Sequence, residues 1–197
     1  MKELIVATKN QGKVSEFRQM FSKYNISVKS LLDIDRIIDI EETGTTFEAN
    51  AIIKAEAMVE LLGLPVVADD SGLEVDALDG EPGVYSARYA GMEKDDQKNT
   101  AKLLRELEGK TDKERTARFV CAVAVARPGV ETFVKRGTCE GKIATEPQGT
   151  NGFGYDPVFI PRGSTRTLAE HSSDEKNAIS HRHHAIEQIE DWLKTLS

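Results

Sequence analysis

The chain has few cysteines and no long apolar run. Only two of its 197 residues are cysteines, Cys121 and Cys139, and both lie in strand-like segments. We expect them to be reduced thiols in a core rather than parts of a disulfide framework. The apolar run near the N-terminus is too short for a signal peptide, and no stretch is long enough to span a membrane. The sequence therefore predicts a cytoplasmic protein with no membrane partner.

Positive charge is also scarce. Lysine and arginine number 26 against 33 acidic residues, which gives a formal net charge of -7. Nucleic-acid grooves and anionic membranes require basic patches, so we expect no nucleic-acid partner. A single nucleoside triphosphate needs only a few local cations and a metal, and this class of ligand remains open. Residues 1–197 are long enough for one domain with a substantial core or for two small lobes.

Two adjacent carboxylates follow an apolar run in the middle of the sequence. Residues 66–68 predict a buried strand, which we expect to end at Asp69 and Asp70 before a turn at Ser71 and Gly72. Residues 73–77 alternate between apolar and acidic side chains and predict a half-buried strand. Carboxylates at a strand end lie where open α/β sheets place their ligands.

The same carboxylates are candidate metal ligands. Adjacent ionised carboxylates repel each other, and a hard divalent cation relieves that repulsion. Mg2+ prefers carboxylate oxygens together with substrate phosphates, so Asp69, Asp70 and the more distant Glu41 are candidates. The alternative is a polar turn in which one Asp caps a backbone amide, with Glu41 an ordinary surface acid.

The first loop of the chain has the features of an anion site. Residues 4–7 predict a buried strand, and a helix follows with Val14, Phe17, Met20 and Phe21 on one face. The intervening Thr8–Lys13 offers backbone N–H groups, short polar donors and the charge of Lys13 to an anion. It is not a Walker A loop, because the glycine spacing differs and Val14 stands where Ser or Thr is needed. The alternative is an ordinary helix cap with a solvated lysine.

Two later helices and a hairpin are also predicted. Thr45 and Glu48 have capping-box spacing at the start of a helix that should end near Leu62, with Lys54 on the same face as Phe47 and Asn50. A further helix begins at Asp95 or Asp96, and residues 119–126 and 131–140 predict an antiparallel hairpin.

Residues 150–157 form a second unusual loop, in which small residues flank two aromatic rings and a carboxylate. An aromatic face can stack on a base, and Asp156 can accept a hydrogen bond from a ring N–H. The alternative is a glycine-rich turn whose aromatic side chains fill the core.

The last 26 residues predict a helical region that begins with a capping box at Ser172 and Glu175. It contains three histidines close together, but these lack Cys or Glu partners at zinc-ligand spacing. We expect residues 176–184 to be a solvated basic patch that binds an anion or a carbonyl.

Taken together, these stretches resemble the inosine triphosphate pyrophosphatase family, also called XTP/dITP diphosphatases. The resemblance covers essentially the whole chain, through ATKNQGK, EETGTTFEANAIIKA, VVADDSGLEVDAL, GEPGVYSARYAG, GFGYDPVF and AEHSSDEKNAISHR. It implies an elongated α/β fold with a mixed sheet flanked by helices, in two lobes with the active site in the cleft between them. It also implies a homodimer and Mg2+-dependent hydrolysis of nonstandard purine nucleoside triphosphates to the monophosphate and pyrophosphate.

The resemblance also implies roles for individual residues. Asp70 matches the general base and, with Glu41, the Mg2+ ligands, while Asp69 matches a further polar residue at that centre. The residues that match substrate contacts are Thr8, Lys9, Asn10, Gln11, Gly12, Lys13, Lys54, Ser71, Phe153, Gly154, Tyr155, Asp156, Lys176, His181 and Arg182. The family often has Trp where this chain has Tyr155, and the aromatic face is kept.

Three other classes of protein are weaker matches. A Maf-like nucleotide pyrophosphatase should lack both the SHR stretch and the GFGYDP loop, which are present here. A nucleotide-binding regulatory protein without turnover does not require a general base, so the set of Glu41, Asp69, Asp70 and Lys13 counts against it. A nucleic-acid-binding module conflicts with the net charge.

Overall fold

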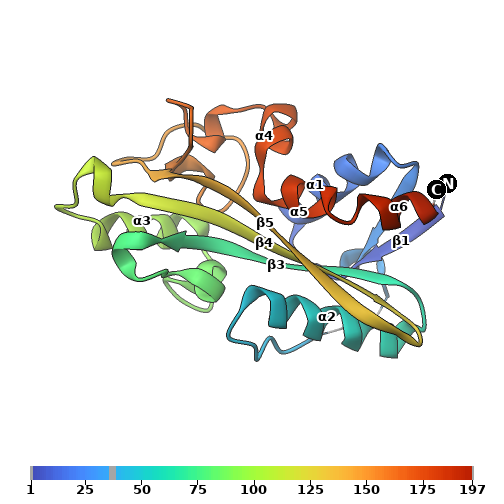
Figure 1. Cartoon of the computed structure of the whole chain (residues 1–197). Helices are drawn as coiled ribbons and strands as arrows, with labels where there is room; N and C mark the ends of the chain where they lie inside the picture. The colour runs from blue at the N-terminus through green and yellow to red at the C-terminus, as the bar shows by residue number, and fades with distance from the viewer. Residues whose placement is uncertain (1, 36–38, 197) are drawn as a thin grey trace. The chain divides into compact units, whose positions relative to one another are not determined.

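The computed structural model describes residues 2–35 and 39–196 as a mixed α/β fold (Figure 1). One mixed sheet has the strand order β2-β1-β3-β4-β5-β6. The strands are β1 (Lys2–Val6), β2 (Ile26–Ser30), β3 (Val66–Val75), β4 (Thr116–Arg127), β5 (Val130–Ile143) and β6 (Phe159–Pro161). The α-helices are α1 (Gln11–Ser22), α2 (Phe47–Leu62), α3 (Asp96–Glu106), α4 (Ser173–Ile179), α5 (His181–Glu187) and α6 (Glu190–Leu196). The predicted α/β class with a mixed sheet is confirmed.

The chain divides into two compact units. Unit 1 comprises Met1–Asp70, Cys121–Gly137 and Arg182–Ser197, and unit 2 comprises Ser71–Val120 and Thr138–His181. The chain passes from one unit to the other within β3, β4 and β5, so each of these strands contributes residues to both. Each unit has its own apolar core.

The core of unit 1 lies between strands and the helices α1, α5 and α6. Phe17 and Phe21 of α1 meet edge to face, with ring centroids 5.5 Å apart, among buried side chains of β1, β3 and β4. Ile186 and Leu193 bring the last two helices into the same cluster. Helix α2 lies on the other side of these strands, as Figure 1 shows. This arrangement confirms the apolar stripe that was predicted for the first helix.

The caps of α1 and α2 explain where these helices begin and end. Asn10 is the N-cap of α1, and its side chain accepts the Lys13 N–H at 3.1 Å. Helix α2 is capped by Thr46, not by the predicted Thr45, because the Thr46 hydroxyl accepts the Ala49 N–H at 3.1 Å. The helix ends at Gly63, which adopts the left-handed conformation with φ 63° that glycine tolerates best.

Strand β3 does not break where the sequence predicted a turn. It runs without interruption from Val66 to Val75, so that Asp69, Asp70 and the Ser71-Gly72 pair all lie within the strand. The expected turn is wrong because β3 has a hydrogen-bonded neighbour on each side, β1 and β4. A central strand satisfies its backbone groups on both edges, and this outweighs the local preference of Ser-Gly for a turn.

Unit 2 is organised around its parts of β3, β4 and β5 and around α3. Phe119 and Phe159 are 4.6 Å apart between ring centroids in its core, and the same cluster contains Leu103 of α3 and Leu107, the residue that follows this helix. Strands β4 and β5 are neighbours joined by only Pro128 and Gly129, as the predicted hairpin requires. The capping box at Ser172 and Glu175 is present at the start of α4.

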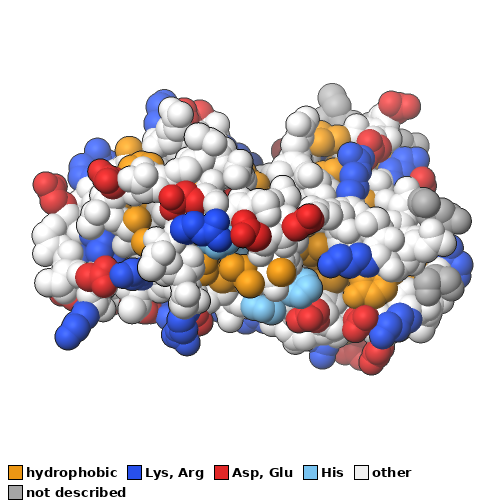
Figure 2. Space-filling model, turned by 90° about the horizontal axis from the view of Figure 1, so that it is seen from above, with side chains coloured by type: hydrophobic (Ala, Val, Ile, Leu, Met, Phe, Trp, Pro, Cys, Tyr) orange, Lys and Arg blue, Asp and Glu red, His pale blue; other side chains and the backbone are white. Residues whose placement is uncertain are grey.

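Two expectations about composition can be compared with the structure. Cys121 and Cys139 are both buried free thiols, as predicted. Among the residues that the structure describes, no helix combines the length and apolar character needed to cross a membrane. Acidic and basic side chains are interspersed on the face shown in Figure 2, in keeping with the mixed charge of the chain.

Candidate active site

In unit 1, the Thr8–Lys13 loop lies beside Asp69 and Asp70 of β3. This follows because β1, which precedes the loop, ends before its neighbour β3 does. Strands β1 and β3 are parallel, and Val6, the last residue of β1, is opposite Val67. The Ala7 N–H still donates to the Val67 carbonyl at 2.8 Å, and the chain then leaves the sheet as the Thr8–Lys13 loop. Strand β3 continues past this point to Asp69 and Asp70. The two motifs therefore meet beyond the end of β1.

Lys13 and Asp69 form a buried ion pair at this junction. The Lys13 Nζ is 2.8 Å from the Asp69 Oδ2, and the Asp69 side chain is fully buried. Burial raises the pKa of Asp69, but the positive charges of Lys13, Arg182 and Lys54 outweigh it and hold the pKa well below its ordinary value. Asp69 is therefore ionised and already compensated by cations.

Asp70 has the opposite electrostatic environment. It is 6% exposed, and its Oδ2 accepts a hydrogen bond from the Asn50 Nδ2 at 3.0 Å. Burial raises the pKa of Asp70 above its ordinary value, and Glu42 raises it further, against the opposing effect of Lys54 and Lys13. Two adjacent carboxylates with pKa values pushed apart are the usual sign of divided roles in acid–base chemistry.

The loop ahead of α2 brings Glu42, rather than Glu41, against Lys54. The Lys54 Nζ is 2.7 Å from the Glu42 Oε1, and Glu41 is exposed. Burial lowers the pKa of Lys54, but Asp69, Glu42 and Asp70 together raise it above its ordinary value. Lys54 is thus a charged group placed among three carboxylates.

Sequence reasoning missed the part that Asn50 plays here. Its Oδ1 accepts the Gly44 N–H at 2.8 Å while its Nδ2 donates to Asp70, so one side chain ties the acidic loop to the strand. Gly44 has no room for a side chain, since a Cβ there would lie 2.7 Å from the Asn50 Oδ1. The sequence did contain a signal for this role: Asn50 is a polar residue on the same helix face as the apolar Phe47, and both are buried.

The Thr8–Lys13 segment contains the start of α1, where backbone N–H groups can donate to a ligand. Thr8 is buried, and its hydroxyl accepts the Asn10 N–H at 3.2 Å. The Asn10 side chain is engaged as the cap, as the alternative interpretation of this loop predicted, but Lys13 is paired and largely buried rather than solvated. Gln11 and Gly12 are the first residues of α1, and their N–H groups have no acceptor within the helix. Lys9 is exposed and lies 3.9 Å from the Asp39 carboxylate.

Arg182 lies inside unit 1. Its side chain is 1% exposed and pairs with Glu16 of α1 and, at 3.4 Å, with the Asp69 Oδ2. The expected solvated patch at residues 176–184 is therefore wrong at this position, because the guanidinium is neutralised by buried carboxylates. Glu16 was not identified from the sequence, although a lone acid between Val14 and Phe17 on a buried helix face was a signal.

In unit 2, Lys176 is also buried and organises the residue 152–156 loop. The Lys176 Nζ is 2.5 Å from the Asp156 Oδ2 and lies 4.6 Å from the centroid of the Phe153 ring. Asp156 also accepts the Phe153 N–H at 3.0 Å. Asp156 is thus occupied by groups of its own unit, and the solvated patch is wrong at Lys176 as well.

Tyr155 fills the core instead of presenting a ring to solvent. It is 5% exposed, its hydroxyl donates to the Ser86 carbonyl at 2.6 Å, and burial raises its pKa. The alternative of an aromatic plug therefore describes Tyr155, whereas Phe153 is only half-buried. The Gly154 N–H donates to Asp96 at 2.8 Å, a contact that sequence reasoning did not identify.

The two remaining predicted contacts also lie in unit 2. His181 is 5% exposed and stacks on Phe119 with ring centroids 4.8 Å apart and an interplanar angle of 15°. Ser71 is half-buried in β3, directly after Asp70.

One carboxylate of unit 1, that of Asp70, has the chemistry that a hard cation prefers. Within residues 2–35 and 39–196 no three His, Cys, Asp or Glu side chains gather as a ready-made metal cluster. Asp70 is nevertheless a nearly buried carboxylate whose ionisation is disfavoured by burial and by Glu42. A divalent cation would relieve that cost, and carboxylate oxygens are the ligands that Mg2+ prefers.

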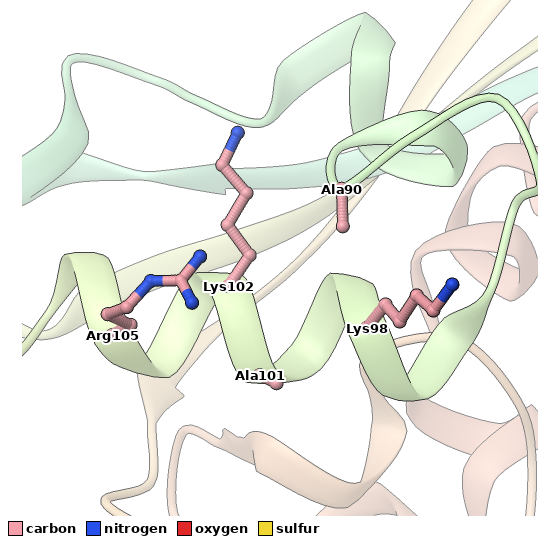
Figure 3. Close-up of a pocket in the computed structure, with 5 residues that line it drawn as sticks. All are labelled: Ala90, Lys98, Ala101, Lys102 and Arg105. Atoms are coloured by element: carbon pink, nitrogen blue, oxygen red, sulfur yellow. The ribbon is translucent and has the colours of Figure 1, made fainter.

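Figure 3 shows a different pocket, in unit 2. Its volume is about 470 Å³, and it is lined by Ala90, Lys98, Ala101, Lys102 and Arg105. Lys98 pairs with Glu93 at 2.9 Å, and the Lys102 Nζ donates to the Tyr89 carbonyl at 2.9 Å. None of the five lining residues is a carboxylate, so this pocket lacks the groups for metal-assisted hydrolysis.

The fold and these residues define a class of protein, an α/β protein in which a lysine and a helix start lie beside two unlike carboxylates. The comparisons with known proteins name the family. The model of the Ham1 family matches residues 4–192, and the chain belongs to this family. The resemblance drawn from the motifs is confirmed.

Individual relatives cover nearly the whole chain. A "dITP/XTP pyrophosphatase" of Halalkalibacterium halodurans is 61% identical over 98% of this chain and 100% of its own. A protein of the same name from Bacillus subtilis is 54% identical over 98% of both chains. The solved structure of the Staphylococcus aureus Ham1 protein matches with a TM-score of 0.87 and 45% identity, over 100% of both chains.

Proposed function

We propose that this chain hydrolyses nonstandard purine nucleoside triphosphates (XTP, ITP and dITP) to the monophosphate and pyrophosphate. It would thereby remove deaminated purines from the nucleotide pool. The observation that carries the proposal is the pair Asp69 and Asp70, one ionised beside Lys13 and one with a raised pKa. Relatives of 54–61% identity that bear the name dITP/XTP pyrophosphatase support the choice of substrate.

The loop of residues 8–13 binds the triphosphate in this proposal. The ammonium of Lys13 and the free N–H groups at the start of α1 are donors for phosphate oxygens. Cleavage between the α- and β-phosphates builds negative charge on the leaving pyrophosphate. Fixed donors at that position stabilise the charge without reorganisation during the reaction.

Asp70 takes the proton of the attacking water. A raised pKa brings a carboxylate closer to the working pH, where a general base is most effective. Asp70 and Glu41 would hold Mg2+, which when bound neutralises phosphate charge and acidifies water. Lys54, charged and close to Asp70, adds a further cation for the phosphates.

Base selection falls to the residues that the family resemblance assigns to the purine. Lys176 and His181 carry N–H donors, and the half-buried Phe153 offers an aromatic face. Such donors favour the 6-keto acceptor of hypoxanthine and xanthine over the 6-amino donor of adenine. Rejection of GTP then requires that its 2-amino group be left unpaired or crowded, a penalty of roughly 1–3 kcal/mol for one buried donor.

Product analysis tests this proposal. The protein is incubated with Mg2+ and, separately, ITP, XTP, dITP, ATP and GTP, and the phosphate products are identified. Monophosphate and pyrophosphate from the first three alone are expected. Diphosphate with orthophosphate, or equal use of all five, would contradict the proposed reaction or the proposed base selection.

The oligomeric state follows from the family resemblance and is part of the proposal. A homodimer of the 21.7 kDa chain should give twice that mass in light scattering. A mass equal to one chain at assay concentrations would contradict it.

A further inference from the structure

We infer that Asp69 is a positioning residue, whose buried carboxylate fixes the ammonium of Lys13 for the phosphates instead of holding the metal or accepting a proton. This inference rests on the proposed function, because Lys13 acquires its phosphate role there. It assigns the two neighbouring carboxylates separate tasks: Asp70 serves the water and the metal, and Asp69 serves the lysine.

The geometry of Asp69 is that of an anchor. Its side chain is fully buried, and its Oδ2 lies 2.8 Å from the Lys13 Nζ and 3.4 Å from the Arg182 Nη2. The Lys13 side chain is 13% exposed, so its flexible stem is held in place rather than free in solvent. A lysine whose rotamer is already fixed loses less entropy when it binds an anion.

Arg182 in turn holds Asp69, through the same Oδ2 atom that Lys13 contacts. The guanidinium pairs with Glu16 as well as with Asp69, which gives an alternating series of charges, Glu16, Arg182, Asp69 and Lys13. All four side chains belong to unit 1, and Arg182 and Asp69 are almost completely buried. Because each member is held by the next, the position of the ammonium is determined by the interior of the unit.

The same surroundings make Asp69 a poor metal ligand. Two cations already lie against its Oδ2, and a divalent cation at this carboxylate would be repelled by both. Its Oδ1 has no hydrogen-bond partner among the described residues, but this atom is buried. Asp70 is 6% exposed and accepts a hydrogen bond from the neutral Asn50 amide at 3.0 Å, so it is the carboxylate better suited to a metal.

The test is a double-mutant cycle with Asp69→Asn and Lys13→Met, alone and combined. Binding of inorganic tripolyphosphate is measured by calorimetry without metal, and binding of Mn2+ alone is measured by electron paramagnetic resonance. Asp69→Asn should weaken tripolyphosphate binding about tenfold, the size of one charge-assisted contact, and leave Mn2+ affinity within about twofold. In the Lys13→Met background, Asp69→Asn should have no further effect on tripolyphosphate.

Steady-state kinetics with ITP give a second readout. A positioning role predicts that Asp69→Asn lowers kcat/KM for ITP about tenfold, because Lys13 contacts the phosphates both in the bound substrate and during cleavage, and that it has no further effect in the Lys13→Met background. Lost Mn2+ binding with unchanged tripolyphosphate binding would make Asp69 a metal ligand and overturn the inference. Equal effects of Asp69→Asn in both Lys13 backgrounds would also overturn it.

A measurement on the wild-type protein tests the inference even if Asp69→Asn does not fold. The Lys13 ammonium signal in a ¹H–¹⁵N spectrum, assigned by its loss in Lys13→Met, should show restricted motion without metal or nucleotide. Mobility equal to that of the exposed Lys9 would overturn the inference. Absence of pyrophosphate release by the wild type would refute the proposed function, and the tripolyphosphate cycle would still report on Asp69.

Discussion

At the residue scale, Asp69 and Asp70 are neighbours in one strand, yet their side chains meet different surroundings. Successive side chains of a strand point to opposite faces of the sheet. Asp69 consequently meets Lys13 and Arg182, whereas Asp70 meets Asn50. The difference between the two carboxylates follows from the strand geometry, which the sequence-based expectation of a turn at this point had obscured.

Replacing Asp70 with Asn should abolish turnover and stabilise the metal-free protein. Loss of a general base should lower kcat by at least about 10²-fold, while ITP binding remains measurable. The folded-state pKa of Asp70 lies above its ordinary value of 3.8, so its ionisation weakens the fold as pH rises through the raised pKa. Removing the charge should therefore increase the free energy of unfolding at pH 7 by on the order of 1 kcal/mol, with no difference below pH 3.

The control for Asp70→Asn is Asp33→Asn, which removes a carboxylate that pairs with Arg18 at 2.9 Å on the surface. Its turnover should equal that of the wild type. Turnover is measured by steady-state kinetics with ITP. The free energy of unfolding is measured by urea titration at pH 7 and below pH 3. Unchanged turnover in Asp70→Asn would remove Asp70 as the base.

Arg115 carries a second prediction at the residue scale. It is 4% exposed, and its guanidinium donates to the carbonyl groups of Leu107, Ile143 and Ala144 at 2.7–2.9 Å. Arg115→Met leaves three carbonyl groups without this donor, at roughly 1–3 kcal/mol each, so the free energy of unfolding should fall by about 3 kcal/mol or more. The exposed Arg105→Met should change it by less than about 0.5 kcal/mol. Equal urea midpoints for the two variants would contradict this account.

At the element scale, helices were easier to predict than strands. The apolar stripe of α1 and the stop of α2 at Gly63 depend on residues within one or two turns, so local patterns sufficed. The continuity of β3 depends on hydrogen bonds to β1 and β4, which are distant in the sequence. For the same reason the turn at Ser71 and Gly72 was predicted wrongly.

The loop before Asp156 offers a matched pair of glycines. Gly152 and Gly154 both have left-handed backbones, with φ 74° and φ 61°. A Cβ on Gly152 would lie 2.0 Å from the Asp156 Oδ2, whereas one on Gly154 would meet nothing within 4 Å. Both alanine variants should lose about 1 kcal/mol through backbone strain, and Gly152→Ala a further 1–3 kcal/mol, roughly, through displacement of Asp156. Thermal unfolding measures the difference, and equal melting temperatures would mean that the Asp156 contacts contribute nothing.

At the scale of the whole molecule, family and fold class were predictable, but the burial of the charged residues was not. Glu16 and Arg182 are 166 residues apart in the sequence and become an ion pair only when the ends of the chain fold into one unit. Lys176 and Asp156 are separated by 20 residues, and they likewise become a buried pair only in the folded unit 2. Composition describes such residues as polar, and polar residues are mostly exposed. The exceptions cost free energy unless paired, and each of these buried charges has an ion-pair partner within its own unit.

Metal binding should be visible in the stability of the whole chain. A ligand that binds only the folded state stabilises it by RT ln(1 + [L]/Kd), about 2.7 kcal/mol at one hundred times Kd. For a chain of this size, Mg2+ at that excess should raise the melting temperature of the metal-free protein by about 5–10 °C. Asp70→Asn should lose most of this shift, because its amide cannot neutralise the cation, whereas Asp33→Asn should keep it. A wild type whose melting temperature Mg2+ leaves unchanged would mean that the nucleotide-free protein binds no Mg2+. An Asp70→Asn variant with the full shift would place the metal away from Asp70.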